Sequence, residues 1–227
     1  LWCMIYHKRF SRLTNMKNLW KKYHHIGIVL LYMPIYFLWY FGLQQKEFIY
    51  HDVYTAVDAH IPFIDFFIWF YVYWFIFVVV TCLLLFFTSR KEFYRICAAL
   101  FIGMTICLII FTIYPTSFSH RPPLQSSEGI SGWMVQNIYE ADRCVNVFPS
   151  IHVYNSIVCA VALWKSKVLP YEKTRKIVGV LSAILITLST LFIRQHSILD
   201  GLAAGVLAIF ICVPIYKTKK DKKKAEL

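Results

Sequence analysis

Charge is scarce in this sequence, and negative charge is the scarcest. Asp and Glu number 12 among 227 residues, against 24 Lys and Arg, and charged residues make up 16% of the chain while hydrophobic residues make up 59%. Ordinary soluble domains carry about 25% charged residues. Together with a mean hydropathy of +0.55, this composition excludes a soluble globular domain and predicts a polytopic membrane protein.

Patterns that bind metals or form disulfides are also missing. None of the seven cysteines belongs to a Cys-x-x-Cys pair, and four of them lie well inside apolar runs. This spacing argues against a zinc site and against a disulfide framework. We expect no metal and no cofactor. The first apolar run lacks a small-residue cleavage site, so we interpret it as a retained span and not as a signal peptide.

Six apolar segments can be marked, at about residues 26–43, 63–87, 95–114, 149–164, 177–193 and 198–216. A spanning helix needs about 20 residues, so the fourth segment must gain length at its ends. Of the 24 Lys and Arg, 20 precede the first segment, follow the sixth, or lie in the two loops on that same side. The positive-inside rule then predicts six spans in a cell membrane with both termini in the cytoplasm.

The same placement of charge bears on partners. A net charge of +12 is compatible with nucleic-acid binding, but the basic residues lie in short blocks beside apolar runs, as cytoplasmic loops require. We therefore expect membrane lipids and no nucleic acid as partners. The oligomeric state is not predicted by the sequence.

The expected fold is all-α, a polytopic bundle of six transmembrane helices with its active site at the outer membrane face. Residues 1–25 form a basic cytoplasmic segment, 26–216 the membrane domain and 217–227 a basic cytoplasmic tail. The chain begins at Leu1, and MKNLWKKYHH from Met16 looks like a natural cytoplasmic start. Residues 1–15 are then a candidate upstream extension.

Three segments fall on the predicted outer face: 44–62, 115–147 and the turn before the last span. The stretch from Gly132 to Arg143 is either a short interfacial helix or a plain connector. Three titratable residues near the second span, Asp58, His60 and Asp65, are interpreted as a solvated rim. Every candidate catalytic residue falls on this outer face.

The strongest chemical signal is FIRQHSILDGLAAG, from Phe192 to Gly205. His196 and Asp200 are four residues apart, so on a helix they share one face and the carboxylate can fix the tautomer of the imidazole. The other imidazole nitrogen is then free to act as a nucleophile or base. The pair lies between two apolar runs, where ionisable residues are costly and often functional. The alternative is a satisfied pair at a helix end, and this spacing taken alone does not indicate catalysis, because it also arises by chance.

Two further motifs precede it. In NVFPSIH, the proline opens a helix whose free N–H groups around Ser150 and Ile151 predict an anion site, with His152 at its mouth. In HRPP, Arg121 offers a planar fork suited to phosphate oxygens. Each motif is weak when taken alone.

Taken together, the three motifs resemble the type 2 phosphatidic acid phosphatase (PAP2) superfamily. Its members share, in order, an Arg-Pro element, a Pro-Ser-x-His element and a His-x-x-x-Asp element. The matching positions here are Arg121-Pro122, Pro149 to His152 and His196 to Asp200, within roughly residues 60–215. The stretches YPTSFSHRPP and NVFPSIHV look closer to the branch of the inositol phosphorylceramide synthases than to the soluble acid phosphatases.

The sequence departs from the family pattern at two positions. Tyr114 stands where the first motif commonly has a lysine, and Thr190 stands where the third often has an arginine. Two phosphate-binding cations are thus absent, which puts the charge state of the substrate and the activity in question. Arg194, two residues before His196, is our candidate replacement.

The resemblance implies a metal-free mechanism in which His196, oriented by Asp200, attacks phosphorus and His152 protonates the leaving alcohol. Arg121, Arg194 and the N–H groups near Ser150 would hold the phosphate oxygens. The first choice of function is an integral membrane phosphatase that hydrolyses a lipid phosphate or diphosphate through a phosphohistidine. The alternatives are a lipid phosphotransferase, as in the synthase branch, and a non-catalytic relative or transporter.

Overall fold

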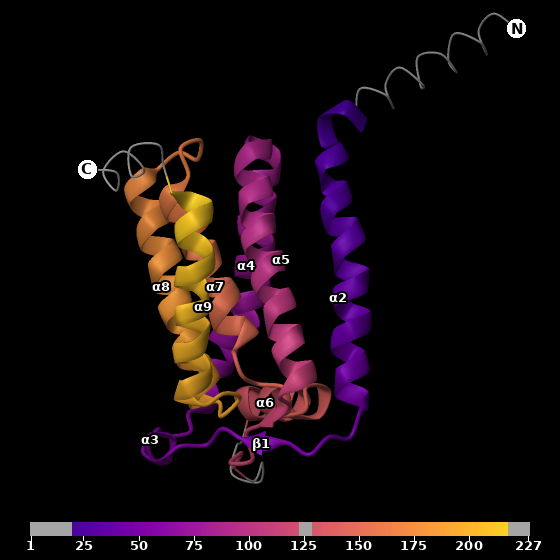
Figure 1. The fold of residues 1–227 in the computed structure, drawn as a ribbon. Coiled ribbons are helices and arrows are strands. Elements are labelled where there is room, and N and C mark those ends of the chain that lie inside the picture. Colours follow the sequence, from indigo (N-terminus) through magenta and orange to yellow (C-terminus); the bar gives the residue numbers. More distant parts are fainter. Residues whose placement is uncertain (1–19, 123–128, 218–227) are drawn as a thin grey trace, which may run out of the picture.

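The computed structural model describes residues 20–122 and 129–217. Long helices stand side by side in a bundle (Figure 1), and they are α2 (Gly27–Gln45), α4 (Ile68–Thr88), α5 (Arg90–Ile113), α8 (Glu172–Phe192) and α9 (Ile198–Tyr216). All five, α2 and α4 with the short turns before them, are long and apolar enough to cross a membrane. The predicted all-α helical bundle is confirmed.

The remaining apolar segment forms the central helix of the bundle. Helix α7 (Ile151–Lys165) packs against α4, α5, α8 and α9. Its 15 residues span about 22 Å, less than the roughly 30 Å of a hydrocarbon core. Among residues 20–122 and 129–217, five helices therefore meet the length for a span, and the sixth span stays a prediction.

Close packing fixes α7 against α5 at a glycine. A Cβ added to Gly103 would lie 2.0 Å from Cζ of Tyr154, so only glycine leaves room for this ring. The Tyr154 hydroxyl donates to the carbonyl oxygen of Ala99 at 2.6 Å. The ring is fully buried, and it fixes the N-terminal half of α7 against α5.

The outer faces of the long helices carry large exposed apolar side chains. Leu38 on α2 is 77% exposed and Phe210 on α9 is 73% exposed. Side chains of this kind on a helix surface suit contact with lipid. Helix α2 begins and α9 ends at the same end of the bundle (Figure 1).

Short elements gather at the opposite end of the bundle (Figure 1). They are β1 (His51–Asp52), α3 (Ala56–Ala59), η2 (Asp65–Phe67), β2 (Thr116–Ser117) and α6 (Gly129–Ala141), whereas η1 (His24–Ile26) precedes α2. The two strands pair in parallel, with His51 opposite Thr116. Helix α6 confirms the helical alternative for this loop, and its Trp133 is 65% exposed.

Candidate active site

His196 and Asp200 form a buried pair at the start of α9. The imidazole Nδ1 lies 3.1 Å from Asp200 Oδ2, and the two residues are 8% and 0% exposed. Asp200 and Ser197 also form a capping box, since Asp200 Oδ2 accepts the Ser197 N–H at 3.0 Å. A carboxylate held in this way fixes the tautomer with Nδ1–H, which leaves Nε2 with a free lone pair.

The local geometry differs from the expected one. His196 lies in the turn before the helix, because Ser197 is the N-cap and the first helical residue is Ile198. The contact with Asp200 therefore comes from the capping turn and not from a shared helix face. His196 N–H donates to the carbonyl of Thr190 at 3.1 Å, which anchors this turn to the end of α8.

His152 faces His196 from the first turn of α7. Its Nδ1 lies 3.5 Å from His196 Nε2, the nitrogen that Asp200 leaves free. The ring centroid of His152 lies 4.6 Å from that of Tyr71 and 4.4 Å from that of Trp74, both on α4. Two histidines from different motifs thus meet at one point, with aromatic rings on the far side of His152.

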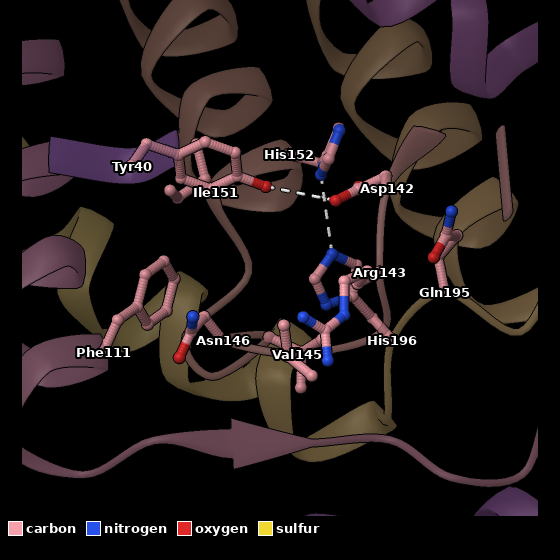
Figure 2. Close-up of a pocket in the computed structure, with 11 residues that line it drawn as sticks. Tyr40, Phe111, Asp142, Arg143, Val145, Asn146, Ile151, His152, Gln195 and His196 are labelled. Carbon is pink, nitrogen blue, oxygen red and sulfur yellow. Dashed lines mark hydrogen bonds between the residues drawn. The ribbon is translucent and has the colours of Figure 1, made fainter. Parts of the chain in front are cut away.

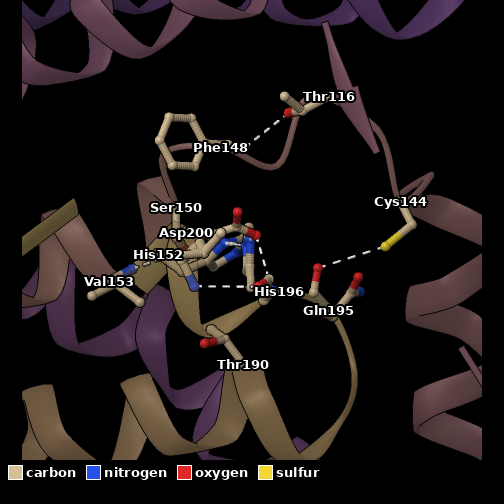
Figure 3. Close-up of polar contacts among 12 residues, drawn as sticks. Thr116, Cys144, Phe148, Ser150, His152, Val153, Thr190, Gln195, His196 and Asp200 are labelled. Carbon is tan, nitrogen blue, oxygen red and sulfur yellow. Dashed lines mark hydrogen bonds and ion pairs between the residues drawn. The ribbon is translucent and has the colours of Figure 1, made fainter. Parts of the chain in front are cut away.

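Ser150 joins the second and third motifs through the backbone (Figure 3). Its N–H donates to the Asp200 carbonyl at 3.2 Å, and its hydroxyl caps α7 by accepting the N–H of Val153. The Ser150 amide is therefore already occupied, contrary to our expectation of a free donor. The amides of Ile151 and His152 open α7 and have no acceptor within the helix.

Arg121 contacts the segment beside His196 through the side chain of Gln195. Its guanidinium donates to the carbonyls of Tyr139 (3.3 Å) and Asp142 (3.0 Å) and to the side-chain oxygen of Gln195. It also lies over the Tyr139 ring, 4.1 Å from the centroid. Gln195 directly precedes His196, so Arg121 stabilises the turn that contains His196. Its Nε is buried and has no partner among the described residues.

Arg194 points elsewhere. Its φ is 53°, in the left-handed region, and this conformation directs the side chain to the 55–61 segment. The guanidinium donates to the carbonyl of Asp58 at 2.7 Å and to that of Ile61. Arg194 does not line the pocket beside the histidines. These contacts favour a positioning role over the phosphate-binding role that we expected.

Asp58 is buried and contacts the start of α9, whereas the sequence predicts an exposed residue. It is 1% exposed, so its interpretation as part of a solvated rim was wrong. Its carboxylate accepts the Ser197 hydroxyl at 2.7 Å and the Ile198 N–H at 2.9 Å, and it also caps α3 through Thr55. No local motif signals this role, because the partners lie in a distant part of the chain.

A small pocket lies beside the two histidines (Figure 2). Polar or charged groups in its wall include those of Tyr40, Asp142, Arg143, Asn146, His152, Gln195 and His196. Asp142 accepts a hydrogen bond from the Tyr40 hydroxyl at 3.2 Å. Burial raises the pKa of the Asp142 carboxyl above 3.8, against the opposing effects of His196, Tyr40 and Arg121.

The family's two cation positions contribute nothing to this pocket. Tyr114 is 50% exposed and stacks on His51, with 4.2 Å between ring centroids. Thr190 is fully buried, and its hydroxyl donates to the carbonyl of Thr187 at 2.8 Å. Within the described ranges, no group of three His, Cys, Asp or Glu side chains is arranged to hold a metal ion.

Comparison with known proteins gives one match. The sequence model described as PAP2 superfamily matches residues 43–213, about three quarters of the chain and all three motifs. None of the curated proteins and none of the solved structures compared with the chain matches it significantly. The paired histidines, the aspartate behind one of them and the order of the motifs agree with this match, and the chain belongs to the PAP2 superfamily.

Proposed function

We propose that the protein is an integral membrane phosphatase that hydrolyses a lipid phosphate or diphosphate ester. Membership of the PAP2 superfamily suggests a lipid phosphoesterase of the phosphatase type. The observation that carries the proposal is the contact between His196 Nε2 and His152 Nδ1 at 3.5 Å, with Asp200 on the opposite nitrogen of His196. In the proposed mechanism His196 attacks phosphorus and His152 protonates the leaving group.

In the first step, the Nε2 lone pair of His196 forms a bond to phosphorus, and the bond to the lipid oxygen breaks. His152, entering this step protonated, gives its proton to the leaving alkoxide. Asp200 stabilises the positive imidazole that forms on His196. In the second step, neutral His152 takes a proton from water, the oxygen of that water attacks phosphorus, and Nε2 leaves.

Access from the outer leaflet is part of the proposal. The site lies at the end of the bundle that carries α3 and α6, opposite the start of α2 and the end of α9 (Figure 1). The 20 to 4 division of Lys and Arg between the two sets of loops and ends in the sequence supports a cytoplasmic location for both ends of the chain. A site at headgroup depth suits a phosphate on an acyl or prenyl tail, so no chain of the lipid needs to leave the membrane.

A lipid phosphotransferase is the second candidate function. It is favoured by Asp142, whose carboxylate lines the pocket beside both histidines and can accept a hydrogen bond from an alcohol. Hydrolysis and transfer share the first step and differ only in which hydroxyl takes the phosphoryl group from His196.

Purified full-length protein should be incubated with a panel of lipid phosphates in EDTA, with and without a lipid alcohol. We expect release of inorganic phosphate that is lost in His196→Ala. Formation of a new phospholipid in place of phosphate would favour the transferase. Neither product across the panel would contradict both and leave a non-catalytic membrane protein.

A further inference from the structure

Two residues of the pocket have no role in the family's three motifs. Arg143 and Asn146 lie in the segment between α6 and α7, just before the Pro-Ser-Ile-His motif, and both line the pocket with His152 and His196 (Figure 2). Each contains hydrogen-bond donors suited to a phosphate oxygen. The inference below rests on the proposed function, because it concerns the phosphoryl group handled at the same site.

Asn146 is a buried polar residue without a partner for its side chain. It is 5% exposed, and neither its Oδ1 nor its Nδ2 has a hydrogen-bond partner among the described residues. Buried amides are nearly always paired, so an unpaired one that lines a pocket needs an explanation. Its φ of 57° lies in the left-handed region, which asparagine tolerates better than most residues. The backbone there holds the carboxamide in the wall of the pocket.

Arg143 is the one arginine or lysine among the described residues that line this pocket. Its Nη1 donates to the carbonyl of Gln44 at 3.0 Å, which ties the side chain to the end of α2. One edge of the guanidinium is therefore positioned by protein, and the other donors remain for a ligand. Arg121 and Arg194, in contrast, direct two guanidinium nitrogens each to protein acceptors and lie outside the pocket wall.

We infer that Arg143 and Asn146 bind the substrate phosphoryl group and take the place of the two cations that are absent at Tyr114 and Thr190. Arg143 supplies the positive charge, and the Asn146 amide supplies a neutral donor to a second oxygen. The phosphoryl group then lies beside Nε2 of His196. Arg121 and Arg194 hold the surrounding loops in place and so keep this wall in position.

The first test measures binding of inorganic phosphate to purified full-length protein by calorimetry, which requires no turnover. Arg143→Gln should weaken binding by about 10- to 100-fold, the usual effect of losing a hydrogen bond to a charged group. Arg143→Lys keeps the charge and should recover part of the loss. The matched control is Lys46→Gln, which removes another exposed cation outside the pocket and should change the affinity by less than about twofold.

The second test uses substitutions at Asn146 that preserve its left-handed backbone conformation. Asn146→Gly and Asn146→Asp both accommodate a positive φ, so loss of binding would not come from backbone strain. Glycine should weaken phosphate binding by about 3- to 10-fold, and aspartate should weaken it more because it adds a like charge. Asn137→Gly, on the exposed face of α6, is the control for a change of asparagine elsewhere.

The outcomes separate this inference from the proposed function. Phosphate affinity in Arg143→Gln equal to that in Lys46→Gln, or no phosphate binding by the wild-type protein, would overturn the inference. Weaker phosphate binding in the Arg143 and Asn146 variants, without turnover of any lipid phosphate by the wild-type protein, would support phosphate binding by these two residues. It would contradict the proposed phosphatase activity. Where turnover is present, orthovanadate inhibition should weaken in the same order as phosphate binding.

Discussion

Asp58 accepts a hydrogen bond of 2.7 Å from the hydroxyl of Ser197, across 139 positions of the sequence. It accepts a second one from the Ile198 N–H at 2.9 Å, at the N-terminus of α9. A carboxylate at a helix N-terminus is favoured both by the unpaired N–H groups and by the helix dipole. After His196, Ser197 and Ile198 donate to the Asp58 carboxylate. Before His196, Arg194 donates to the main-chain carbonyls of Asp58 and Ile61. Both ends of the turn that contains His196 are therefore held by the 58–61 segment.

The first prediction is that Asp58→Asn destabilises the protein and lowers turnover. The change leaves donors without their carboxylate acceptor at a buried position, which costs about 1–3 kcal/mol. Burial alone would raise the pKa of Asp58, but hydrogen bonds from Ile198, Ser197 and Thr55 lower it below 3.8. Stability from this group is therefore present above pH 3.8 and is lost as the pH falls through the lowered pKa.

Thermal unfolding of purified Asp58→Asn and wild type at pH 7 and pH 3 measures this effect. The difference in unfolding temperature should be clear at pH 7 and smaller at pH 3. Asp65→Asn, a half-buried carboxylate near α4, is the matched control and should change little. Equal unfolding temperatures of wild type and Asp58→Asn at pH 7 would contradict the proposed stabilising role of the Asp58 carboxylate.

Sequence reasoning identified the central part of the site because its residues lie inside short motifs. His152, His196 and Asp200 were predicted, and the structure brings them together. The contacts of Asp58 were missed because they join segments far apart in the chain. Its nearness to His196 in sequence predicts that Arg194 binds the phosphate, but its guanidinium donates to the carbonyls of Asp58 and Ile61 and does not line the pocket.

The activity lost in His152→Ala is predicted to depend on the leaving group of the substrate, whereas the activity lost in His196→Ala is not. His152→Ala should retain most activity with an aryl phosphate whose leaving group is acidic, because that alcohol leaves without a proton. His196→Ala should fail with every substrate, because no bond to phosphorus can form. Rates of both variants with an alkyl and an aryl phosphate check this. Equal losses of His152→Ala on the two substrates would contradict the division.

The raised pKa of the Asp142 carboxyl predicts that phosphate affinity depends on pH. Because burial raises its pKa above 3.8, the carboxyl is neutral below the raised pKa and repels phosphate above it. Asp142→Asn should therefore bind inorganic phosphate about 10-fold more tightly than wild type at pH 8, a typical effect of one nearby like charge. The ratio of the two affinities should approach one as the pH falls.

Taking the ratio at each pH cancels the ionisation of phosphate and of the histidines. The same group affects stability: a raised pKa means that stability is lost as the pH rises through it, so Asp142→Asn should also unfold at a higher temperature than wild type at pH 8. A ratio of affinities that does not change with pH would show that the Asp142 charge does not act on the phosphate.

The orientation in the membrane can be tested with single cysteines. Lys46 and Lys173 are both exposed, at opposite ends of the bundle. In a background without Cys144, Lys46→Cys should react with an impermeant thiol reagent on intact cells, and Lys173→Cys should react only after the membrane is opened. The reverse pattern would place the histidines on the cytoplasmic side.

The final prediction is that Asp200 acts through His196. Asp200 is fully buried and its Oδ2 lies 3.1 Å from Nδ1 of His196. Asp200→Asn keeps the shape but can present an amide donor where the carboxylate accepted, so it favours the wrong tautomer and no longer stabilises the positive imidazole. Turnover should fall strongly while phosphate affinity changes little, and added divalent metal should not restore turnover.

The double variant with His196→Ala provides the decisive comparison. Residues that act as a unit are non-additive, so once the nucleophile is gone the aspartate has nothing left to orient. The double variant should therefore be hardly slower than His196→Ala alone. If the two losses multiply, Asp200 has an independent function. If magnesium restores Asp200→Asn, the carboxylate is a metal ligand. Either result would contradict the assignment of His196 as a nucleophile oriented by Asp200.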